Sequence, residues 1–262
     1  MAKLAARRAA EKRRRRRQRL VAGGIGLVVV LGLVGGLSAV VLTRHEKTPA
    51  AAATPTAATS SAVASVTPSP PSGPVACGGE VPKAASVPKP QFKSPPRLSI
   101  DKSSRYTAVV KTSCGTIEFR LLARQAPVAV NSFVFLARKG FYDGLTFHRV
   151  VRDFVIQGGD PTGTGSGGPG YQFKDELNNS LSYRIGTVAM ANSGPDTNGS
   201  QWFIVAGRQG TTLPRRYTIL GQVVKGLDVV RRIDSIPTVG GSGNGDRPVK
   251  TVYIERVAIR QH

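Results

Sequence analysis

The chain has 262 residues and carries 37 Lys and Arg against 15 Asp and Glu, which gives a formal net charge of +22. Its two cysteines are too few for a disulfide-dense scaffold or for a four-thiolate zinc site. Its three histidines lie far apart in the sequence, so we expect no metal site. Such a strong positive charge ordinarily suggests a nucleic-acid-binding protein, and its distribution along the chain tests that interpretation.

The excess charge is unevenly distributed. The first 47 residues carry a net charge of +10, residues 48–100 carry +3, and residues 101–262 carry +9. Most of the N-terminal charge belongs to the basic run KRRRRRQR at 12–19, which directly precedes an uncharged apolar segment. Because the run adjoins a candidate membrane span, we interpret it as a topology signal and expect no nucleic-acid partner.

The 23 residues from Leu20 to Leu42 contain no charged side chain. A helix of about 20 residues crosses a hydrocarbon layer roughly 30 Å thick, and basic residues beside a span stay in the cytoplasm. A cleaved signal peptide is the alternative, but it has a shorter apolar stretch and a small-residue exit that LSAVVLTRH lacks. We therefore expect a cytoplasmic segment over 1–19 and a single transmembrane helix over 20–42, with the rest of the chain outside.

The next segment, 43–100, has the composition of a tether. Residues 48–76 contain only Ala, Thr, Ser, Pro, Val and Gly, with six prolines, and show no apolar periodicity. Such a segment cannot bury enough surface to offset the entropy of ordering it. We expect a disordered linker that continues as an irregular, proline-rich approach to the folded part.

Residues 101–262 have the length of one domain, and their apolar residues mostly recur with a period of two. A hairpin is expected from Tyr106–Lys111 and Thr116–Leu121, and helices are expected at Pro127–Lys139 and Gly226–Asp234. Further strands are expected at Thr146–Val151, Val155–Gly158, Thr187–Ala191, Gln201–Ala206, Thr218–Val223 and Val252–Ile259. This pattern predicts a mainly β domain, a closed antiparallel barrel of about eight strands capped by two helices.

Two segments carry an unusual combination of residues about 40 positions apart. Phe147–Pro161 reads FHRVVRDFVIQGGDP, and Met190–Ile204 reads MANSGPDTNGSQWFI. Through these motifs the chain resembles the cyclophilins, the peptidyl-prolyl cis–trans isomerases, from about Tyr106 to Arg260. The glycine-rich loop at 163–170 resembles the bacterial form of the family. The resemblance implies a cyclophilin-like fold and an isomerase that needs no metal, nucleotide or other cofactor.

The chemistry of prolyl isomerisation accounts for these residue types. Rotation about the amide has a barrier of about 18–20 kcal/mol, because the nitrogen lone pair is delocalised. A catalyst has to stabilise a twisted amide whose nitrogen has regained its lone pair, so it needs a fixed donor and a dry pocket for the ring. Arg149 is the candidate donor, since a guanidinium is always charged and carries five N–H groups.

The resemblance assigns further roles residue by residue. Gln157 would position the arginine and Asn192 would hold the substrate backbone, so these two join Arg149 as catalytic candidates. The candidates for substrate binding are Phe154, Val155, Ala191, Gln201, Phe203, Leu213 and Tyr217.

The chain departs from the family pattern around the expected pocket. Val155 stands where many cyclophilins have Met, Thr212 where Trp is common, Tyr217 where His is usual, and Leu220 where Phe is usual. The arginine and both motif cores are retained, so we expect activity to be retained. The resemblance also implies cyclosporin as a ligand, but the missing indole removes a donor and apolar contact area, and we expect a reduced affinity.

The two cysteines, Cys77 and Cys114, both follow the expected membrane span. On the translocated side disulfides persist, so we expect the two to pair and to close a loop of roughly 38 residues, worth about 3–4 kcal/mol.

Together these features predict a single-pass cell-membrane protein with a cytoplasmic N-terminus and an extracytoplasmic isomerase domain. It would assist the folding of exported proteins, with proline-containing polypeptides as clients. The alternative is a membrane-tethered module that binds proline-containing peptides with little turnover, and the altered residues 212–220 favour it.

Overall fold

A computed structural model describes residues 65–66, 73–177, 180–240 and 246–262. The predicted cytoplasmic segment at 1–19, the predicted transmembrane helix at 20–42 and the first part of the predicted tether lie outside these ranges. Within them, no helix is long and apolar enough to cross a membrane.

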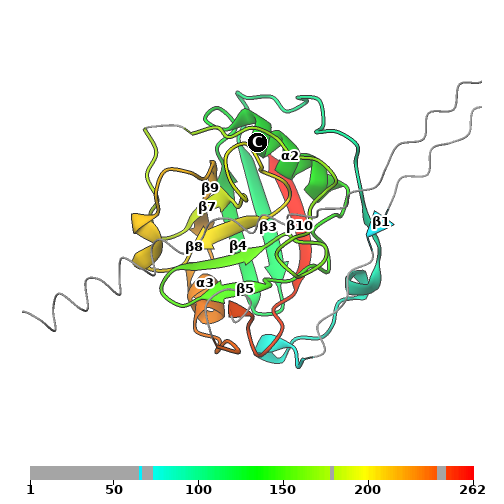
Figure 1. Cartoon of the computed structure of the whole chain (residues 1–262), viewed down its shortest axis with the longest axis vertical. Helices are drawn as coiled ribbons and strands as arrows, with labels where there is room; N and C mark the ends of the chain where they lie inside the picture. The colour runs from blue at the N-terminus through cyan, green and yellow to red at the C-terminus, as the bar shows by residue number, and fades with distance from the viewer. Residues whose placement is uncertain (1–64, 67–72, 178–179, 241–245) are drawn as a thin grey trace, which may run out of the picture. The chain divides into compact units, whose positions relative to one another are not determined.

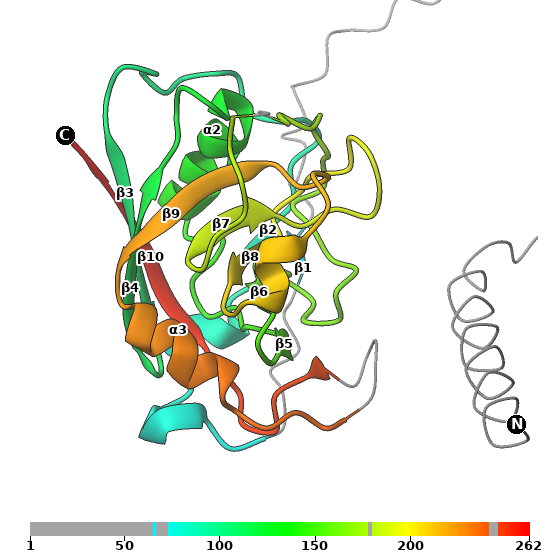
Figure 2. The ribbon, with the colours of Figure 1, turned by 90° about the vertical axis from the view of Figure 1, so that its left-hand side faces the viewer.

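The domain is built on an antiparallel sheet of eight strands, with one α-helix at either end (Figures 1 and 2). The strand order is β10-β3-β4-β9-β7-β8-β6-β5. The strands are β3 (Tyr106–Thr112), β4 (Gly115–Leu121), β5 (Arg149–Val151), β6 (Val155–Gly158), β7 (Thr187–Met190), β8 (Trp202–Val205), β9 (Ile219–Lys225) and β10 (Ile254–Gln261), and the helices are α2 (Pro127–Arg138) and α3 (Leu227–Asp234). The mainly β fold, the eight strands and the two helices confirm the prediction.

The sheet curls without closing into a complete barrel, which corrects the prediction of a closed one. Strands β5 and β10 are its two edges, and in the described residues they share no ladder. In the described residues, an isolated bridge between Thr146 and Tyr253 spans the seam, with Phe147 N–H donating to the Val252 carbonyl at 2.9 Å. Ile254 of β10 adds two backbone hydrogen bonds, one from the Gly144 N–H and one to the Leu145 carbonyl, each at 2.7 Å. Because β5 has only three residues and pairs with β6, it offers β10 no edge long enough for a ladder.

Local sequence signals place the elements close to their predicted positions. In β3 the burial alternates along the strand, as a period of two requires. Helix α2 has Pro127 in its first turn, where the missing N–H costs nothing. The Glu176 carboxylate accepts the backbone N–H groups of Val128 and Ala129 at 3.0 and 2.9 Å, which satisfies free donors at the start of this helix.

The main core is centred on Trp202 of β8, which is fully buried. Four aromatic rings surround the indole with centroids 5.6 to 6.4 Å away, those of Phe119, Phe133, Tyr142 and Phe147. Because successive strand residues point to opposite faces, the next residue, Phe203, belongs to a second and smaller apolar cluster. Strand β8 therefore contributes both to the core and to the surface that forms the candidate site.

The folded part extends back beyond the predicted boundary at residue 101. Residues 73–100, called the strap below, lie against the domain, although the sequence assigned them to the tether and its irregular approach. The strap contains two 3₁₀ turns, η1 (Ala76–Gly78) and η2 (Lys83–Ser86), and the short strand β2 (Lys89–Pro90), which pairs with β1 (Ser65–Val66). Most of its backbone is irregular, as predicted, but several of its side chains are buried.

Individual side chains fasten the strap. The Lys89 ammonium is buried and donates to the carbonyls of Ala84 and Asp143. Gly144 has a φ of +79°, a backbone conformation that favours glycine over other residues. The strap also passes close to it, because a Cβ added at this position would lie 2.3 Å from the Ala84 carbonyl carbon. The Phe92 ring packs edge-on against Phe135 of α2 with centroids 4.9 Å apart.

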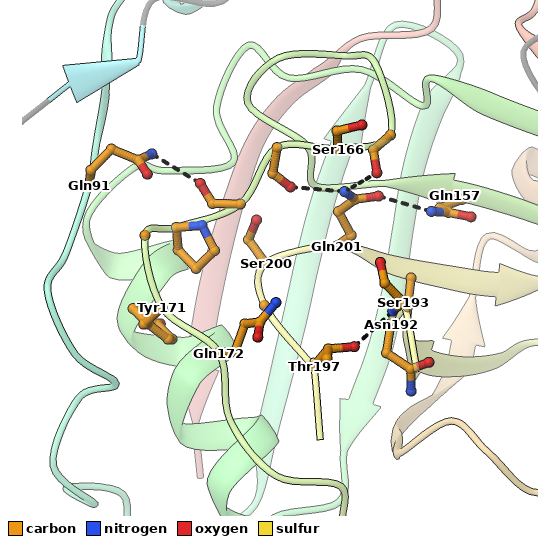
Figure 3. Close-up of a pocket in the computed structure, with 17 residues that line it drawn as sticks. Gln91, Gln157, Ser166, Tyr171, Gln172, Asn192, Ser193, Thr197, Ser200 and Gln201 are labelled. Carbon is orange, nitrogen blue, oxygen red and sulfur yellow. Dashed lines mark hydrogen bonds between the residues drawn. The ribbon is translucent and has the colours of Figure 1, made fainter. Parts of the chain in front are cut away.

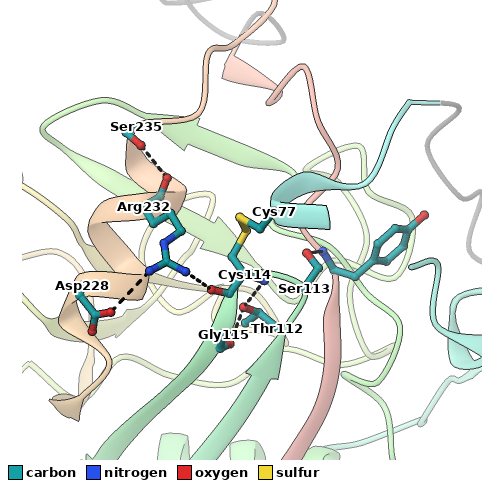
Figure 4. The surroundings of a disulfide bond; sticks show 9 residues. Cys77, Thr112, Ser113, Cys114, Gly115, Asp228, Arg232 and Ser235 are labelled. Carbon is teal, nitrogen blue, oxygen red and sulfur yellow. Dashed lines mark hydrogen bonds and ion pairs between the residues drawn. A yellow bond between two sulfur atoms is a disulfide. The ribbon is translucent and has the colours of Figure 1, made fainter. Parts of the chain in front are cut away.

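A disulfide joins the strap to the first hairpin (Figure 4). It links Cys77 in η1 to Cys114 in the β3–β4 turn, with the Cα atoms 5.0 Å apart, so the predicted pairing is present in the structure. Beside it, the Ala76 N–H donates to the Thr251 carbonyl at 2.9 Å, and the Arg232 guanidinium of α3 donates to the Cys114 carbonyl at 3.1 Å. The start of the strap is thus tied to the hairpin and to the segment before β10, and α3 holds the hairpin at the same point.

Candidate active site

A pocket of about 740 Å³ opens where β5, β6 and β8 meet the loops that follow β7 and η3 (Gln209–Thr212). Nine of the ten predicted site residues line it. They are Arg149, Phe154, Val155, Gln157, Ala191, Asn192, Phe203, Leu213 and Tyr217. Residues separated by almost 70 positions in the sequence therefore form one cavity.

The floor of this pocket is apolar. Val155 of β6 and Phe203 of β8 are almost completely buried, and both belong to the second apolar cluster. Leu213 and Tyr217 pack against this cluster from the loop before β9, and the Phe203 and Tyr217 rings meet edge to face with centroids 5.4 Å apart. Such a floor can take up a pyrrolidine ring and exclude water from it.

The arginine lies at the polar edge of the pocket. Arg149 and Gln157 face each other across the β5–β6 ladder, and Arg149 Nη1 donates to Gln157 Oε1 at 3.4 Å. On its other side, Arg149 Nε donates to Asp246 Oδ2 at 3.1 Å in an ion pair. The arginine side chain retains 35% of its exposed surface, so it is accessible to a bound peptide.

Gln201, the tenth predicted residue, lines an adjoining pocket of about 550 Å³. Figure 3 shows its amide between the Gln157 side chain, which donates to it at 3.0 Å, and two backbone carbonyls of the glycine-rich loop. Its own Nε2 donates to the carbonyls of Gly165 and Gly167, each at 2.9 Å. A continuous series of hydrogen bonds thus runs from this loop through Gln201 and Gln157 to Arg149.

Asn192 lies at the junction of the two pockets and lines both. Its Nδ2 donates to the Arg216 carbonyl at 2.8 Å and to Asp175 Oδ1 at 3.4 Å. These contacts fix the amide relative to the loop that carries Leu213 and Tyr217.

The pocket also contains residues that the sequence did not predict. Asp246 and Arg247 line it from the segment before β10, and Thr164 lines it from the glycine-rich loop. No periodicity or motif distinguishes Asp246 and Arg247, and only the fold brings them to the arginine.

His148 also lines the pocket and is 9% exposed. Burial lowers the pKa of His148, and the neighbouring Arg149 charge lowers it further, while the nearby Asp160 opposes the shift. Burial therefore favours the neutral form of this imidazole. In residues 73–177, 180–240 and 246–262, no three His, Cys, Asp or Glu side chains come together in a way that could hold a metal ion.

Comparison with known protein families identifies the family of the domain that contains this pocket. The family described as "Cyclophilin type peptidyl-prolyl cis-trans isomerase/CLD" matches residues 107–259, which is more than half of the chain. The chain belongs to the cyclophilin-type peptidyl-prolyl cis–trans isomerases. The match spans nearly all of the sheet, both α-helices and the whole pocket, but excludes the strap.

Individual relatives agree with this assignment of the cyclophilin domain. Peptidyl-prolyl cis-trans isomerase CYP18-2 of Arabidopsis thaliana is 39% identical over 170 residues, covering 63% of this chain and 94% of the relative. Peptidyl-prolyl cis-trans isomerase A of Mycobacterium tuberculosis is 43% identical over 169 residues, covering 58% and 91%. The chain is accordingly an enzyme, a peptidyl-prolyl cis–trans isomerase.

A solved structure shares the fold. A cyclophilin-type isomerase of Cryptosporidium parvum, solved in the presence of the dipeptide Ala-Pro, is 32% identical with a TM-score of 0.55. The alignment covers 60% of this chain and 99% of that protein. The match thus takes in almost the whole of that isomerase and leaves about 40% of the present chain outside it.

Proposed function

We propose that Arg149 catalyses the isomerisation by donating hydrogen bonds to a twisted prolyl amide whose ring lies on the apolar floor. The observation that carries this proposal is the position of the guanidinium, which borders the floor formed by Val155 and Phe203. When the amide twists, its nitrogen regains a lone pair and becomes a better acceptor. A charged donor already in place therefore stabilises the transition state more than the ground state.

We further propose that Asn192 and Gln201 hold the peptide backbone while the bond rotates. Asn192 lines both pockets and Gln201 lines the adjoining one, and each amide is fixed by hydrogen bonds to backbone carbonyls. Rotation about the prolyl bond requires that the peptide on one side of the bond stays fixed while the other side turns. The Cryptosporidium relative solved with Ala-Pro supports proline-containing segments as the ligands.

Turnover is the property that tests this function. With a proline-containing peptide and the full chain in detergent micelles, exchange NMR should show faster cis–trans interconversion than for the peptide alone. The Phe203→Ala variant should bind the peptide more weakly, because the ring pocket loses its largest apolar surface. Peptide binding without faster exchange would contradict the proposal and support a proline-peptide binding module.

For its location, we propose that this isomerase is held outside the cytoplasm by a membrane span at 20–42 and acts on exported proteins. The uncharged 23-residue segment and the basic run before it support the span and its orientation. The disulfide between Cys77 and Cys114 supports an oxidising compartment, where such bonds persist.

Protease access tests the location. In intact bacterial spheroplasts that express the full chain, added protease should digest the isomerase domain and spare a tag on the N-terminus. The matched control replaces the five arginines 13–17 by Gln, which should reduce the uniform orientation. A domain that is digested only after the spheroplasts are lysed would contradict an extracytoplasmic location.

A further inference from the structure

Besides its hydrogen bond to Gln157, the Arg149 side chain forms an ion pair with a carboxylate. Asp246 comes from the segment before β10, 97 residues further along the chain, and its Oδ2 accepts from Arg149 Nε at 3.1 Å. The Gln157 side chain accepts from Nη1 on the other edge of the guanidinium. In the described part of the chain, Nη2 has no hydrogen-bond partner, so its hydrogens remain available for a ligand.

The backbone that carries Asp246 is fixed from two sides. The Arg247 carbonyl accepts from the Val239 N–H at 3.0 Å, and the Val249 N–H donates to the Pro237 carbonyl at 2.9 Å. Two residues further on, the Thr251 N–H donates to the Pro74 carbonyl of the strap at 2.8 Å. The carboxylate therefore reaches the arginine from an anchored position, which is what a side chain that orients another one requires.

The ion pair between Arg149 and Asp246 is partly shielded from water, so it can hold the guanidinium in place. Asp246 retains 17% of its side-chain exposure and Arg149 retains 35%, so water screens this pair less than it screens exposed pairs on the surface. A guanidinium is planar, and holding Nε on one side and Nη1 on the other fixes the plane in which Nη2 lies. An arginine held by Gln157 alone could rotate about that single contact.

From this geometry we propose that Asp246 is a positioning residue of the isomerase, which holds the Arg149 guanidinium so that Nη2 faces the prolyl amide. The inference rests on the role proposed above for Arg149. In this role the carboxylate acts through the arginine and not on the prolyl bond itself. Its removal should therefore lower kcat more than it raises KM, because the apolar floor that binds the ring is unchanged.

A double-mutant cycle in the full chain tests the inference. Asp246→Ala should lower kcat/KM about 10-fold with KM changed less than about 2-fold, and Asp246→Asn, which keeps an acceptor but loses the charge, should lose less. In an Arg149→Ala background, Asp246→Ala should have no further effect. The control is Asp228→Asn, which breaks the exposed ion pair with Arg232 on α3 and should leave activity unchanged.

The outcomes separate the two proposals. An Asp246→Ala variant with wild-type kcat, or one that loses activity by the same factor in both backgrounds, would overturn the positioning role. If Asp246→Ala does not fold, the nearly isosteric Asp246→Asn decides by the same criteria. Full activity of Arg149→Ala would instead overturn the proposed catalytic function.

Discussion

Replacing both Cys77 and Cys114 by Ser should destabilise the domain by about 3–4 kcal/mol. The bond joins residues 37 positions apart. Closing a loop of that length removes roughly 13 cal/mol/K of entropy from the unfolded chain, which amounts to about 3.9 kcal/mol at 25 °C. The strap keeps its contacts through Lys89 and Phe92, so we expect a less stable fold and not an unfolded chain.

Fluorescence of the single tryptophan measures this loss in the full chain. Trp202 is buried in the core, so its emission reports the unfolding of the isomerase domain. Guanidinium titration of the double-serine variant should give the loss stated above, and its Tm should fall by about 6–16 °C. Reduction of the wild-type chain should have the same effect and should leave the variant unchanged. A variant within about 0.5 kcal/mol of the wild type would refute the reasoning.

Two further predictions concern stability. Because burial lowers the pKa of His148, the unfolded chain takes up a proton on this group near pH 6.5, before the folded chain does, so stability should fall as the pH drops below about 6.5. In urea titrations from pH 7.5 to 5.5 the fall should be smaller for His148→Asn, and equal falls in both proteins would exclude this origin. Glu176→Ala should lower the free energy of unfolding by about 1 kcal/mol, because two N–H groups at the start of α2 lose their acceptor. Glu176→Gln keeps one acceptor oxygen and should lower it less. Equal unfolding midpoints for Glu176→Ala and the wild type would contradict this.

Local patterns were sufficient to predict most of the sheet. The alternation in β3 and β4 and the proline at the start of α2 are signals within a single element. The strands of the eight-stranded sheet and the two α-helices begin and end within three residues of those predicted. The prediction for β5 was the least accurate, because Thr146 forms an isolated bridge with Tyr253 and only the three residues from Arg149 continue as a strand. A seam between sheet edges depends on strand tilt and stagger, which the sequence does not encode locally.

The strap was missed for a different reason. Its proline-rich sequence has no periodicity, and it is held by single side chains such as Lys89 and Phe92 and by the close approach of Ala84 to Gly144. A buried lysine in an irregular segment gives no signal that a helical or strand period could reveal. The same holds for Asp246, whose partner lies 97 residues away.

The candidate site was largely predictable because its residues lie in two motifs and one loop. Nine of the ten predicted residues line a single pocket, and Gln201 joins it through Gln157. What the motifs did not contain are the charged residues at the rim, Asp246 and Arg247, since a segment outside the motifs supplies them.

The most direct test of the account is the isomerase activity of Arg149→Ala, measured in the full chain with a protease-coupled proline-peptide assay. Loss of a charged donor should lower kcat/KM by about 30- to 150-fold, which corresponds to about 2–3 kcal/mol of transition-state stabilisation. Arg149→Lys keeps the charge but not the planar fork, and it should recover only part of the activity. An Arg149→Ala enzyme as active as the wild type would contradict the account.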